Sequence, residues 1–244
     1  MSRIRLDLML ERRGLMPSRA RARDAILRGT VSVNGETARK PNQMVGESDC
    51  LELNDPASGY VSRAALKLLA GLEAGGIDPK GRTCLDVGSS TGGFTQVLLE
   101  RGAAHVYAVD VGQAQLHPSL RADPRVTSLE GTNARDLDRS LIPAAIDLVV
   151  SDVSFVSLAK VLGAPLGLAS GTAEAVILFK PQFEVGRAHV GKGGIVTDLD
   201  ASARAMADTV RFIEAAGFAL IAQVPSPIAG GDGNRETVLA FRRG

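Results

Sequence analysis

A glycine-rich turn between an apolar run and a helical pattern is the feature that most limits how this chain can fold. Residues 85–87 read as the end of a buried strand, the turn holds Gly88, Gly92 and Gly93, and the pattern then becomes helical. Glycine lets a backbone approach a ligand where a Cβ would clash, and a helix N-terminus offers unpaired N–H groups. Asp110 ends the next apolar run, near the spacing at which an acid holds a ribose diol. The stretch therefore predicts a ligand-binding turn in a strand–helix–strand unit.

The glycine spacing separates two classes of ligand. A dinucleotide fingerprint reads Gly-x-Gly-x-x-Gly, whereas this chain has Gly88-x-x-x-Gly92-Gly93. That spacing disfavours a pyrophosphate cradle and with it a nicotinamide-dependent oxidoreductase. The Asp-x-Gly-x-x-x-Gly-Gly-Phe pattern resembles instead the S-adenosylmethionine loop of Rossmann-like methyltransferases. From this stretch alone, an ordinary strand–turn–helix with tight packing stays open as the alternative.

The rest of the body alternates between strand and helix patterns. Strand-like runs fall at 82–87, 105–110, 125–129, 146–151, 174–180 and 218–224, and the last run is 236–241. This alternation predicts an α/β fold with a doubly wound, mainly parallel sheet and ligands at the carboxyl ends of its strands. No helical pattern separates the last two runs, and a parallel crossover needs a helix. The last strand should therefore be antiparallel, as in methyltransferase sheets.

Charge is unevenly distributed along the chain. The net charge is only +1, but residues 1–40 hold ten Lys/Arg against four Asp/Glu. This asymmetry indicates an N-terminal segment that meets a polyanion. The two cysteines have no metal-site or disulfide pattern, and no leader-like or membrane-spanning apolar run is present. We expect a cytoplasmic protein without a metal and without membrane attachment.

The N-terminal segment predicts two short helices and a small sheet. Helical spacing covers residues 3–13, Ser18 is a good N-cap for a helix that Gly29 ends, and a strand with an Asn34-Gly35 turn follows. Residues 4–50 resemble the ribosomal protein S-four-like RNA-binding domain. The candidate RNA-binding residues are Arg5, Arg12, Arg13, Arg19, Arg21, Arg23 and Arg28. We expect this α+β domain at 1–57, a linker at 58–61 and the catalytic body at 62–244.

Polar residues stand where strands of the body begin or end. Asp152 follows the fourth run, Lys180 ends the fifth, Glu236 opens the last, and Lys67 lies on the helix that leads into the sheet. Strand ends at one sheet edge converge, so Asp152, Lys180 and Glu236 are expected to surround one site beside the glycine turn. Taken singly, an acid at a strand end is usually a helix cap and a lysine is usually solvated.

The whole chain resembles the TlyA-type, or hemolysin A, family with an FtsJ-like catalytic body. That superfamily methylates RNA ribose 2′-hydroxyls with a Lys-Asp-Lys-Glu tetrad, which Lys67, Asp152, Lys180 and Glu236 match here. The resemblance implies S-adenosylmethionine as methyl donor and cytidine targets in large-subunit ribosomal RNA, in some members also in the small subunit. It implies donor-binding residues at Arg63, Gly88, Ser89, Thr91, Gly92, Gly93, Phe94, Asp110, Asn133 and Asp136. Thr132-Asn133 departs from the FtsJ pattern, which has an acid there.

The tetrad suits the chemistry of a ribose hydroxyl, which must be positioned and must lose its proton. We expect Lys180 to be central, Asp152 to orient it, and Lys67 and Glu236 to hold the ribose and the lysine. Two roles stay open for Lys180, a neutral general base or an ammonium that stabilises the developing alkoxide. The basic segment 186–194 reads either as a lid over the RNA path or as an ordinary surface loop.

Other classes of function fit the sequence less well. A non-catalytic RNA-binding protein with a vestigial Rossmann body is disfavoured by the intact tetrad and donor loop. A pseudouridine synthase is disfavoured because the body has no Gly-Arg-Leu-Asp-type loop. No lytic segment supports the hemolysin name. The oligomeric state is open, and a monomer is compatible with the sequence.

Overall fold

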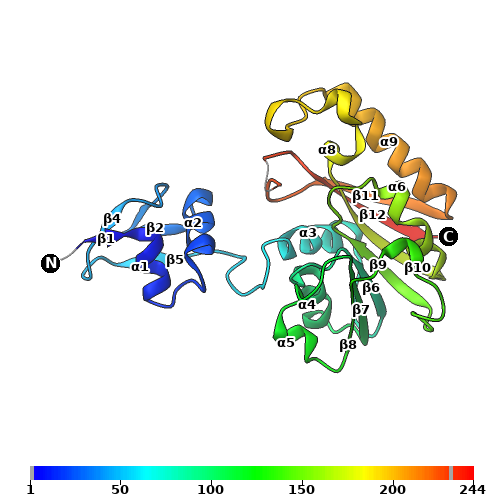
Figure 1. Ribbon diagram of the computed structural model, residues 1–244, viewed down its shortest axis with the longest axis horizontal. Coiled ribbons are helices and arrows are strands. Elements are labelled where there is room, and N and C mark those ends of the chain that lie inside the picture. Colours follow the sequence, from blue (N-terminus) through cyan, green and yellow to red (C-terminus); the bar gives the residue numbers. More distant parts are fainter. Residues whose placement is uncertain (1–2, 231–232) are drawn as a thin grey trace. The chain divides into compact units, whose positions relative to one another are not determined.

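The computed structural model describes residues 3–230 and 233–244, which divide into two compact units (Figure 1). One unit spans Met1–Gly59 and the other Tyr60–Gly244. Each has a hydrophobic core of its own. The division falls inside the segment 58–61, which the sequence predicts to be the linker.

The N-terminal unit packs two helices against short antiparallel strands. Its elements are β1 (Ile4–Arg5), α1 (Leu6–Arg12), α2 (Arg19–Arg28), β2 (Val31–Val33), β3 (Glu36–Thr37), β4 (Met44–Val45) and β5 (Leu51–Leu53). β1 pairs with β4, and β2 pairs with both β3 and β5. Apolar side chains such as Leu10, Ile26 and Val31 form the core between helices and strands.

The first helix is shorter than its sequence pattern predicts. Helical spacing covers residues 3–13, but Ile4 and Arg5 pair with β4, so α1 begins at Leu6. The second helix has the predicted ends. Ser18 Oγ accepts a hydrogen bond from the N–H of Arg21, and Gly29 closes the helix at a φ of 76°, a conformation that favours glycine.

The C-terminal unit is built on a seven-stranded sheet. Its strands are β6 (Thr83–Val87), β7 (His105–Asp110), β8 (Val126–Glu130), β9 (Ile146–Ser151), β10 (Ala169–Phe179), β11 (Phe218–Pro225) and β12 (Thr237–Arg243). The order in the sheet is β11-β12-β10-β9-β6-β7-β8. The strands from β6 to β10 pair in parallel, whereas β12 lies between β10 and β11 and runs antiparallel to both. The predicted direction of the last strand is confirmed.

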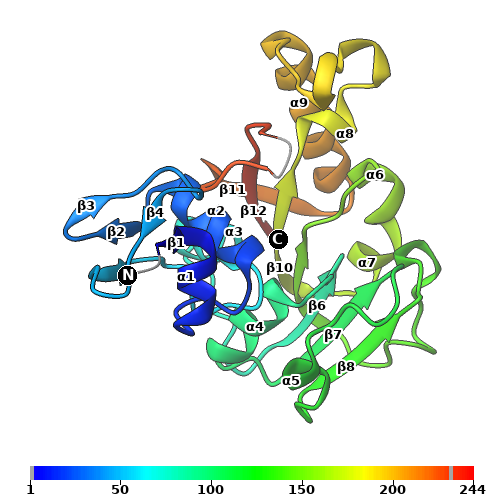
Figure 2. The ribbon, with the colours of Figure 1, turned by 60° about the vertical axis from the view of Figure 1, so that its left-hand side comes forward.

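Helices cover both faces of this sheet (Figures 1 and 2). Alternate strand residues point to opposite faces, and each set packs against its own group of helices. One group comprises α3 (Ala65–Gly75), α4 (Gly93–Glu100) and α5 (Pro118–Arg121). The other comprises α6 (Leu158–Val161), α7 (Gly163–Gly167) and α9 (Leu199–Ala215). The connections hold α8 (Pro181–Glu184) and the 3₁₀ turns η1 (Ala134–Asp136), η2 (Arg187–His189) and η3 (Lys192–Gly194).

In the C-terminal unit, two elements begin three or more residues away from the sequence expectation. The helix predicted from Ser62 begins at Ala65, because residues 62–64 form a turn with hydrogen bonds between residues three apart. The strand predicted over 174–180 starts earlier, at Ala169, and its pairing with β9 is irregular between Ala169 and Glu174. Within the described parts of the chain, no helix is long and apolar enough to cross a bilayer.

Candidate active site

The glycine turn after β6 needs glycine for steric reasons. Gly88 has a φ of 85°, and a Cβ there would lie 3.0 Å from Val153 Cγ1 and 3.1 Å from the carbonyl oxygen of Asp152. Gly92 has a φ of 98°, and its Cβ would meet the side chain of Leu120 at 2.3 Å. At both positions a residue with a side chain would be strained by the positive φ and would clash with its neighbours. The loops after β6 and β9 therefore touch at the carboxyl edge of the sheet.

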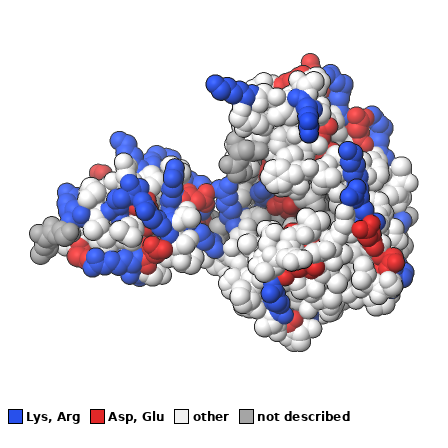
Figure 3. Space-filling model, viewed as in Figure 1, with Lys and Arg blue, Asp and Glu red and all other residues white. Residues whose placement is uncertain are grey.

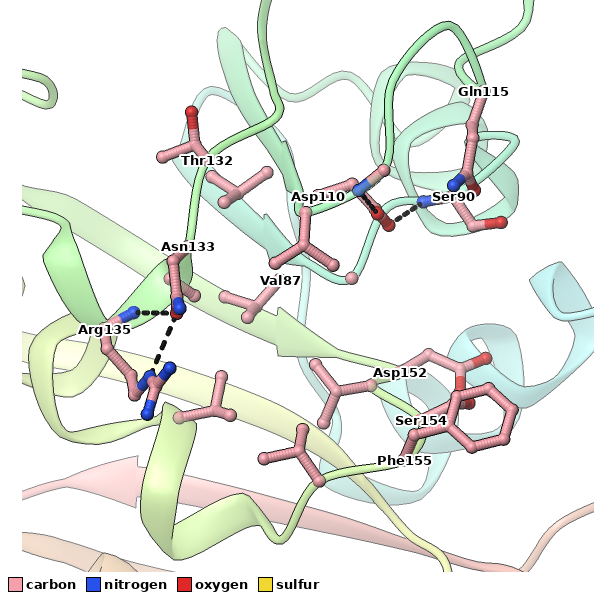
Figure 4. A pocket seen from close by; sticks show the side chains of 18 residues that line it. Val87, Ser90, Asp110, Gln115, Thr132, Asn133, Arg135, Asp152, Ser154 and Phe155 are labelled. Atoms are coloured by element: carbon pink, nitrogen blue, oxygen red, sulfur yellow. Dashed lines mark hydrogen bonds between the residues drawn. The ribbon is translucent and has the colours of Figure 1, made fainter.

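A pocket of about 620 Å³ opens at this edge, beside the ends of β6, β7 and β9 (Figure 4). Asp110 lies on one side, where its carboxylate accepts hydrogen bonds from the N–H of Ser90 at 2.8 Å and of Gly112 at 2.7 Å. Apolar side chains, among them Val87 and Val153, form much of the wall. The pocket thus combines one fixed acid at the end of β7 with an apolar surface.

Polar residues of the segment after β8 form the opposite side. The side-chain oxygen of Asn133 accepts hydrogen bonds from Arg135, from its N–H at 3.1 Å and from its Nε at 3.2 Å. Asp136 is exposed and does not line the pocket, and Arg63 lines neither this pocket nor the smaller one next to it. The pocket geometry therefore gives no support for a donor-binding role of Asp136 or Arg63.

The smaller cavity, of about 170 Å³, joins the glycine turn to the charged residues of the site. It is lined by five predicted donor-binding residues, Gly88, Ser89, Thr91, Gly93 and Phe94, and also by Asp152 and Lys180. The hydroxyl of Ser89 is buried and has no hydrogen-bond partner among the described residues. A polar ligand group in this cavity would satisfy it.

The four residues of the predicted tetrad lie together in the structure. Lys67 Nζ is 2.6 Å from Glu236 Oε2 and 3.8 Å from Asp152 Oδ2. Lys180 Nζ is 2.5 Å from Asp152 Oδ1. Both lysines are 7 % exposed and Glu236 is 4 % exposed. The arrangement is a nearly buried chain of alternating charge, Lys180–Asp152–Lys67–Glu236, whose formal charges cancel.

Two residues of the loop after β9 belong to this site and were not found from the sequence. Ser154 lines both cavities, and its Oγ accepts a hydrogen bond from Lys180 Nζ at 2.8 Å. Phe155 lines the larger pocket, yet its ring is 91 % exposed, and its φ is 67°. A positive φ is rare for a bulky side chain, so no sequence signal could have placed this ring at the mouth of the pocket.

A further acid lies beneath the glycine turn. Asp86 is buried, and Thr95 Oγ1 donates a hydrogen bond to its Oδ2 at 2.7 Å. Burial raises the pKa of Asp86 to about 7, although the hydrogen bond from Thr95 opposes the shift. Asp86 lines neither cavity, so its contacts assign it to the support of the turn.

Both features of the pocket suit S-adenosylmethionine. The fixed carboxylate of Asp110 matches the hydroxyls of a ribose, and the valine-rich wall matches an adenine ring. The unpartnered hydroxyl of Ser89 matches the polar amino-acid end, next to the tetrad. Among the described residues, no group of His, Cys, Asp and Glu side chains is placed to hold a metal ion.

The predicted RNA-binding arginines of the N-terminal unit differ in the groups that they contact. Arg5 and Arg19 both contact the buried Asp7, at 2.8 and 3.1 Å, and their hydrogen bonds lower the pKa of Asp7 to about 2. Arg28 forms a two-point ion pair with Asp55, at 2.8 and 2.6 Å. These contacts hold the unit together, so the arginines that make them also have a structural role.

The other candidate arginines are more open to solvent or bind backbone carbonyls. Arg13 donates to the carbonyl oxygens of Asp49 and Glu47, and Arg21 donates to that of Ala57. Arg12 contacts Glu47 in an exposed ion pair. Arg23 is exposed on α2. Lys and Arg atoms cover much of the face of this unit in Figure 3.

Comparison with known proteins agrees with the architecture of both units. The FtsJ-like methyltransferase family matches residues 60–243, and the S4 domain family matches residues 4–50. The chain is 48 % identical to the 16S/23S rRNA (cytidine-2′-O)-methyltransferase TlyA of Mycobacterium tuberculosis, over 98 % of this chain and 90 % of that protein. It is 42 % identical to the 23S rRNA (cytidine-2′-O)-methyltransferase TlyA of Campylobacter jejuni, over 78 % of this chain and 73 % of that protein.

A solved structure from Streptococcus thermophilus that carries the hemolysin name has a TM-score of 0.77 and 35 % identity. It covers all of this chain, and this chain covers 89 % of it. The fold class predicted from the sequence is therefore confirmed, as is the family resemblance. The chain belongs to the FtsJ-like methyltransferases, in the TlyA (hemolysin A) family that joins this catalytic domain to an N-terminal S4 domain.

Proposed function

We propose that the protein transfers a methyl group from S-adenosylmethionine to the 2′-hydroxyl of a cytidine in ribosomal RNA. The observation that carries this proposal is the buried tetrad, which lies at the junction of the donor pocket and the outer surface. Lys180 and Asp152 line the smaller cavity beside the glycine turn. The names of the relatives support the choice of cytidine and of ribosomal RNA.

The residues of the pocket would hold the methyl donor. Asp110 would accept hydrogen bonds from the ribose hydroxyls, and the apolar wall would cover the adenine. Ser89 and the backbone of the glycine turn would hold the amino-acid end in the smaller cavity. When bound, S-adenosylmethionine supplies a methyl group that is activated by the positive charge on its sulfur.

The tetrad would hold the ribose hydroxyl and accept its proton. An ammonium has three N–H donors, and Lys180 directs two of them at Asp152 and Ser154. The third N–H donor is then available to the ribose 2′-oxygen, and a hydrogen bond there would fix the direction of the oxygen lone pair. As the oxygen–carbon bond formed and the carbon–sulfur bond of the donor broke, the hydroxyl proton would become strongly acidic and could pass to a carboxylate of the tetrad. Positioning of this kind can supply several kcal/mol, about 7–11 in favourable cases.

The Lys67–Glu236 pair completes the positioning. Its ammonium also lies 3.8 Å from Asp152, so it helps to direct that carboxylate between the two lysines. Because the four charges cancel, the cluster can stay buried without a net charge. The exposed ring of Phe155 stands next to the tetrad at the mouth, where a nucleobase could stack on it.

The N-terminal unit would bind ribosomal RNA by its arginines. S4-type recognition through exposed arginines depends on phosphate contacts and on RNA shape, and it weakens with salt. Arg12 and Arg23 are best placed for this role, since their side chains are exposed and are not held by a buried carboxylate. The protein would thus work in the cytoplasm, where ribosomal subunits are assembled.

The test is methyl transfer from labelled S-adenosylmethionine to purified ribosomal subunits, with wild type beside Lys180→Met. Lys80→Met, an exposed lysine before β6, is the matched control. We expect label in large-subunit RNA with wild type and Lys80→Met, resistance of the labelled linkage to alkaline hydrolysis, and loss of transfer with Lys180→Met. Label on a base, or undiminished transfer by Lys180→Met, would refute the proposal.

A further inference from the structure

The loop that carries Asp152 and Phe155 has backbone hydrogen bonds at its two ends, where Asp152 donates one and the carbonyl of Ser157 accepts one. The N–H of Asp152 donates to the carbonyl of Val87 at 3.2 Å. The N–H groups of residues 153–157 donate to no other group within the described parts of the chain. The loop from Asp152 to Ser157 must therefore be held in place by side chains.

Val153 and Val156 of the loop pack against the core, and the segment that follows β10 supplies three further side chains. Pro181 begins the single turn of α8, so Lys180, Phe183 and Glu184 stand at positions i, i+3 and i+4. Residues at this spacing share one face of a helical turn. Each of the three reaches the same loop, at a different point along it.

The three contacts follow the loop from one end to the other. Lys180 contacts Asp152 and Ser154, as described above. The ring of Phe183 lies against that of Phe155, with 5.3 Å between their centroids and a tilt of 53°. A carboxylate oxygen of Glu184 accepts a hydrogen bond from the N–H of Leu158 at 2.8 Å, where α6 begins.

Glu184 caps the N-terminus of α6, which the side chain of Ser157 does not do. Ser157 is the N-cap residue of α6, but its side chain makes no capping hydrogen bond. An N-cap side chain usually satisfies one of the first N–H groups of the helix, and here Glu184 does so from another element. Burial raises the pKa of Glu184, although the hydrogen bond from Leu158 opposes the shift.

The conformation of Phe155 explains why the loop needs this support. Its φ of 67° is unfavourable for a bulky residue, and such conformations persist only where the surroundings enforce them. If the far end of the loop were released at Leu158, Phe155 would relax toward negative φ. The exposed ring and the carboxylate of Asp152 would then both move.

We propose that Glu184 is a positioning residue of the methyl-transfer reaction, which through its hydrogen bond to Leu158 holds the loop 152–157 in the conformation that pairs Asp152 with Lys180. Phe183 assists it by supporting the ring of Phe155. The expected effect of Glu184 on kcat rests on the proposed function, whereas its expected effect on the conformation of the loop does not. Two kinds of measurement therefore separate them.

The kinetic measurement compares Glu184→Gln with Glu184→Leu. Glutamine keeps an oxygen that can accept from Leu158, whereas leucine removes the acceptor. The matched control is Asp147→Leu, because Asp147 also accepts one backbone N–H, that of Thr83 at 3.0 Å, at the other end of β9. We expect Glu184→Gln to keep at least half of the wild-type kcat, and Glu184→Leu to lose about tenfold. Asp147→Leu should lower thermal stability but change kcat less than threefold.

The structural measurement uses the absence of tryptophan from the chain. Phe155→Trp introduces a single fluorescent reporter into the loop, and its anisotropy and acrylamide quenching report how firmly the loop is held. In that background we expect Glu184→Leu to lower the anisotropy and Glu184→Gln to leave it unchanged. Phe183→Leu should lower it too, and it provides the test if Glu184→Leu does not fold.

The outcomes are distinguishable. Unchanged anisotropy in folded Glu184→Leu and Phe183→Leu would overturn the proposal, whatever the activity. Equal loss of kcat in Glu184→Gln and Glu184→Leu, or in Asp147→Leu, would also overturn it, because the hydrogen bond would not be the cause. If wild type transferred no methyl group to RNA, the proposed function would fail, and the reporter would still decide the role of Glu184.

Discussion

Asp152→Asn tests the alternating charge of the tetrad most directly. The substitution keeps the size and shape of the side chain and removes one negative charge. Among the described acids, Asp152 alone contacts both lysines, with Lys180 at 2.5 Å and Lys67 at 3.8 Å. Its loss leaves two ammonium groups and the carboxylate of Glu236 in a nearly buried cluster.

The size of the effect follows from these distances. At an effective dielectric constant of about 20, the attraction of Asp152 is about 7 kcal/mol to Lys180 and about 4 kcal/mol to Lys67. Desolvation offsets much of this gross attraction, and loss of one partner of a buried pair typically costs about 3–5 kcal/mol. If most of that loss falls on the position of Lys180, kcat/KM for RNA should fall by about 10²–10³-fold.

The assay is methyl transfer to large-subunit RNA at saturating donor, with Asp147→Asn as control. Asp147 lies on β9, the strand that Asp152 follows, and accepts a backbone N–H near the other end of that strand. Circular dichroism and thermal unfolding should show Asp152→Asn to be folded. Transfer within fivefold of wild type by folded Asp152→Asn would refute the argument from alternating charge.

Three further predictions concern the mouth, the glycine turn and the RNA-binding unit. Phe155→Ala should raise KM for RNA by about tenfold while changing donor affinity less than threefold, because the exposed ring is expected to contact the base; equal effects on both would contradict this. The free energy of unfolding of Asp86→Asn, relative to that of wild type, should rise by on the order of 3 kcal/mol between about pH 4 and pH 7. The reason is that folded Asp86 keeps its proton until the pH reaches its raised pKa of about 7, whereas the unfolded chain loses that proton near pH 4. Urea unfolding of both proteins at pH 5 and pH 8 measures it, and a pH-independent difference would sink the idea. Arg23→Ala should weaken RNA binding and reduce its salt dependence without unfolding, whereas Arg28→Ala should chiefly lower the melting temperature, because it breaks the ion pair with Asp55.

Much of the fold was predictable because it depends on local patterns. The helix-free connection before the last run was enough to give β12 its antiparallel direction, since a parallel strand needs a crossover. The two-residue strand β1 was not predictable, because Ile4 and Arg5 also fit the helical spacing of the residues that follow. Only their pairing with β4, far along the chain, decides their conformation.

The tetrad was predictable and its supports were not. Asp152, Lys180 and Glu236 stand at strand ends, so position and resemblance both indicated them, whereas Lys67 on α3 was indicated by resemblance alone. Ser154, Phe155 and Glu184 act through a loop whose shape follows from a positive φ and from contacts between two connections. Such contacts have no periodicity in the sequence. The structural engagement of Arg28 with Asp55 was likewise hidden, because Asp55 lies in the breaker-rich stretch before the linker.

The direction of the last strand is itself a requirement of the proposed chemistry. Thr237, the first residue of β12, pairs with Phe179, the last residue of β10. Antiparallel pairing therefore places the residue before β12, Glu236, beside the residue after β10, Lys180. A parallel β12 would bring its C-terminal end to this edge and carry Glu236 to the opposite end of the sheet. The reversal of the last strand thus brings the fourth charge of the tetrad to the other three.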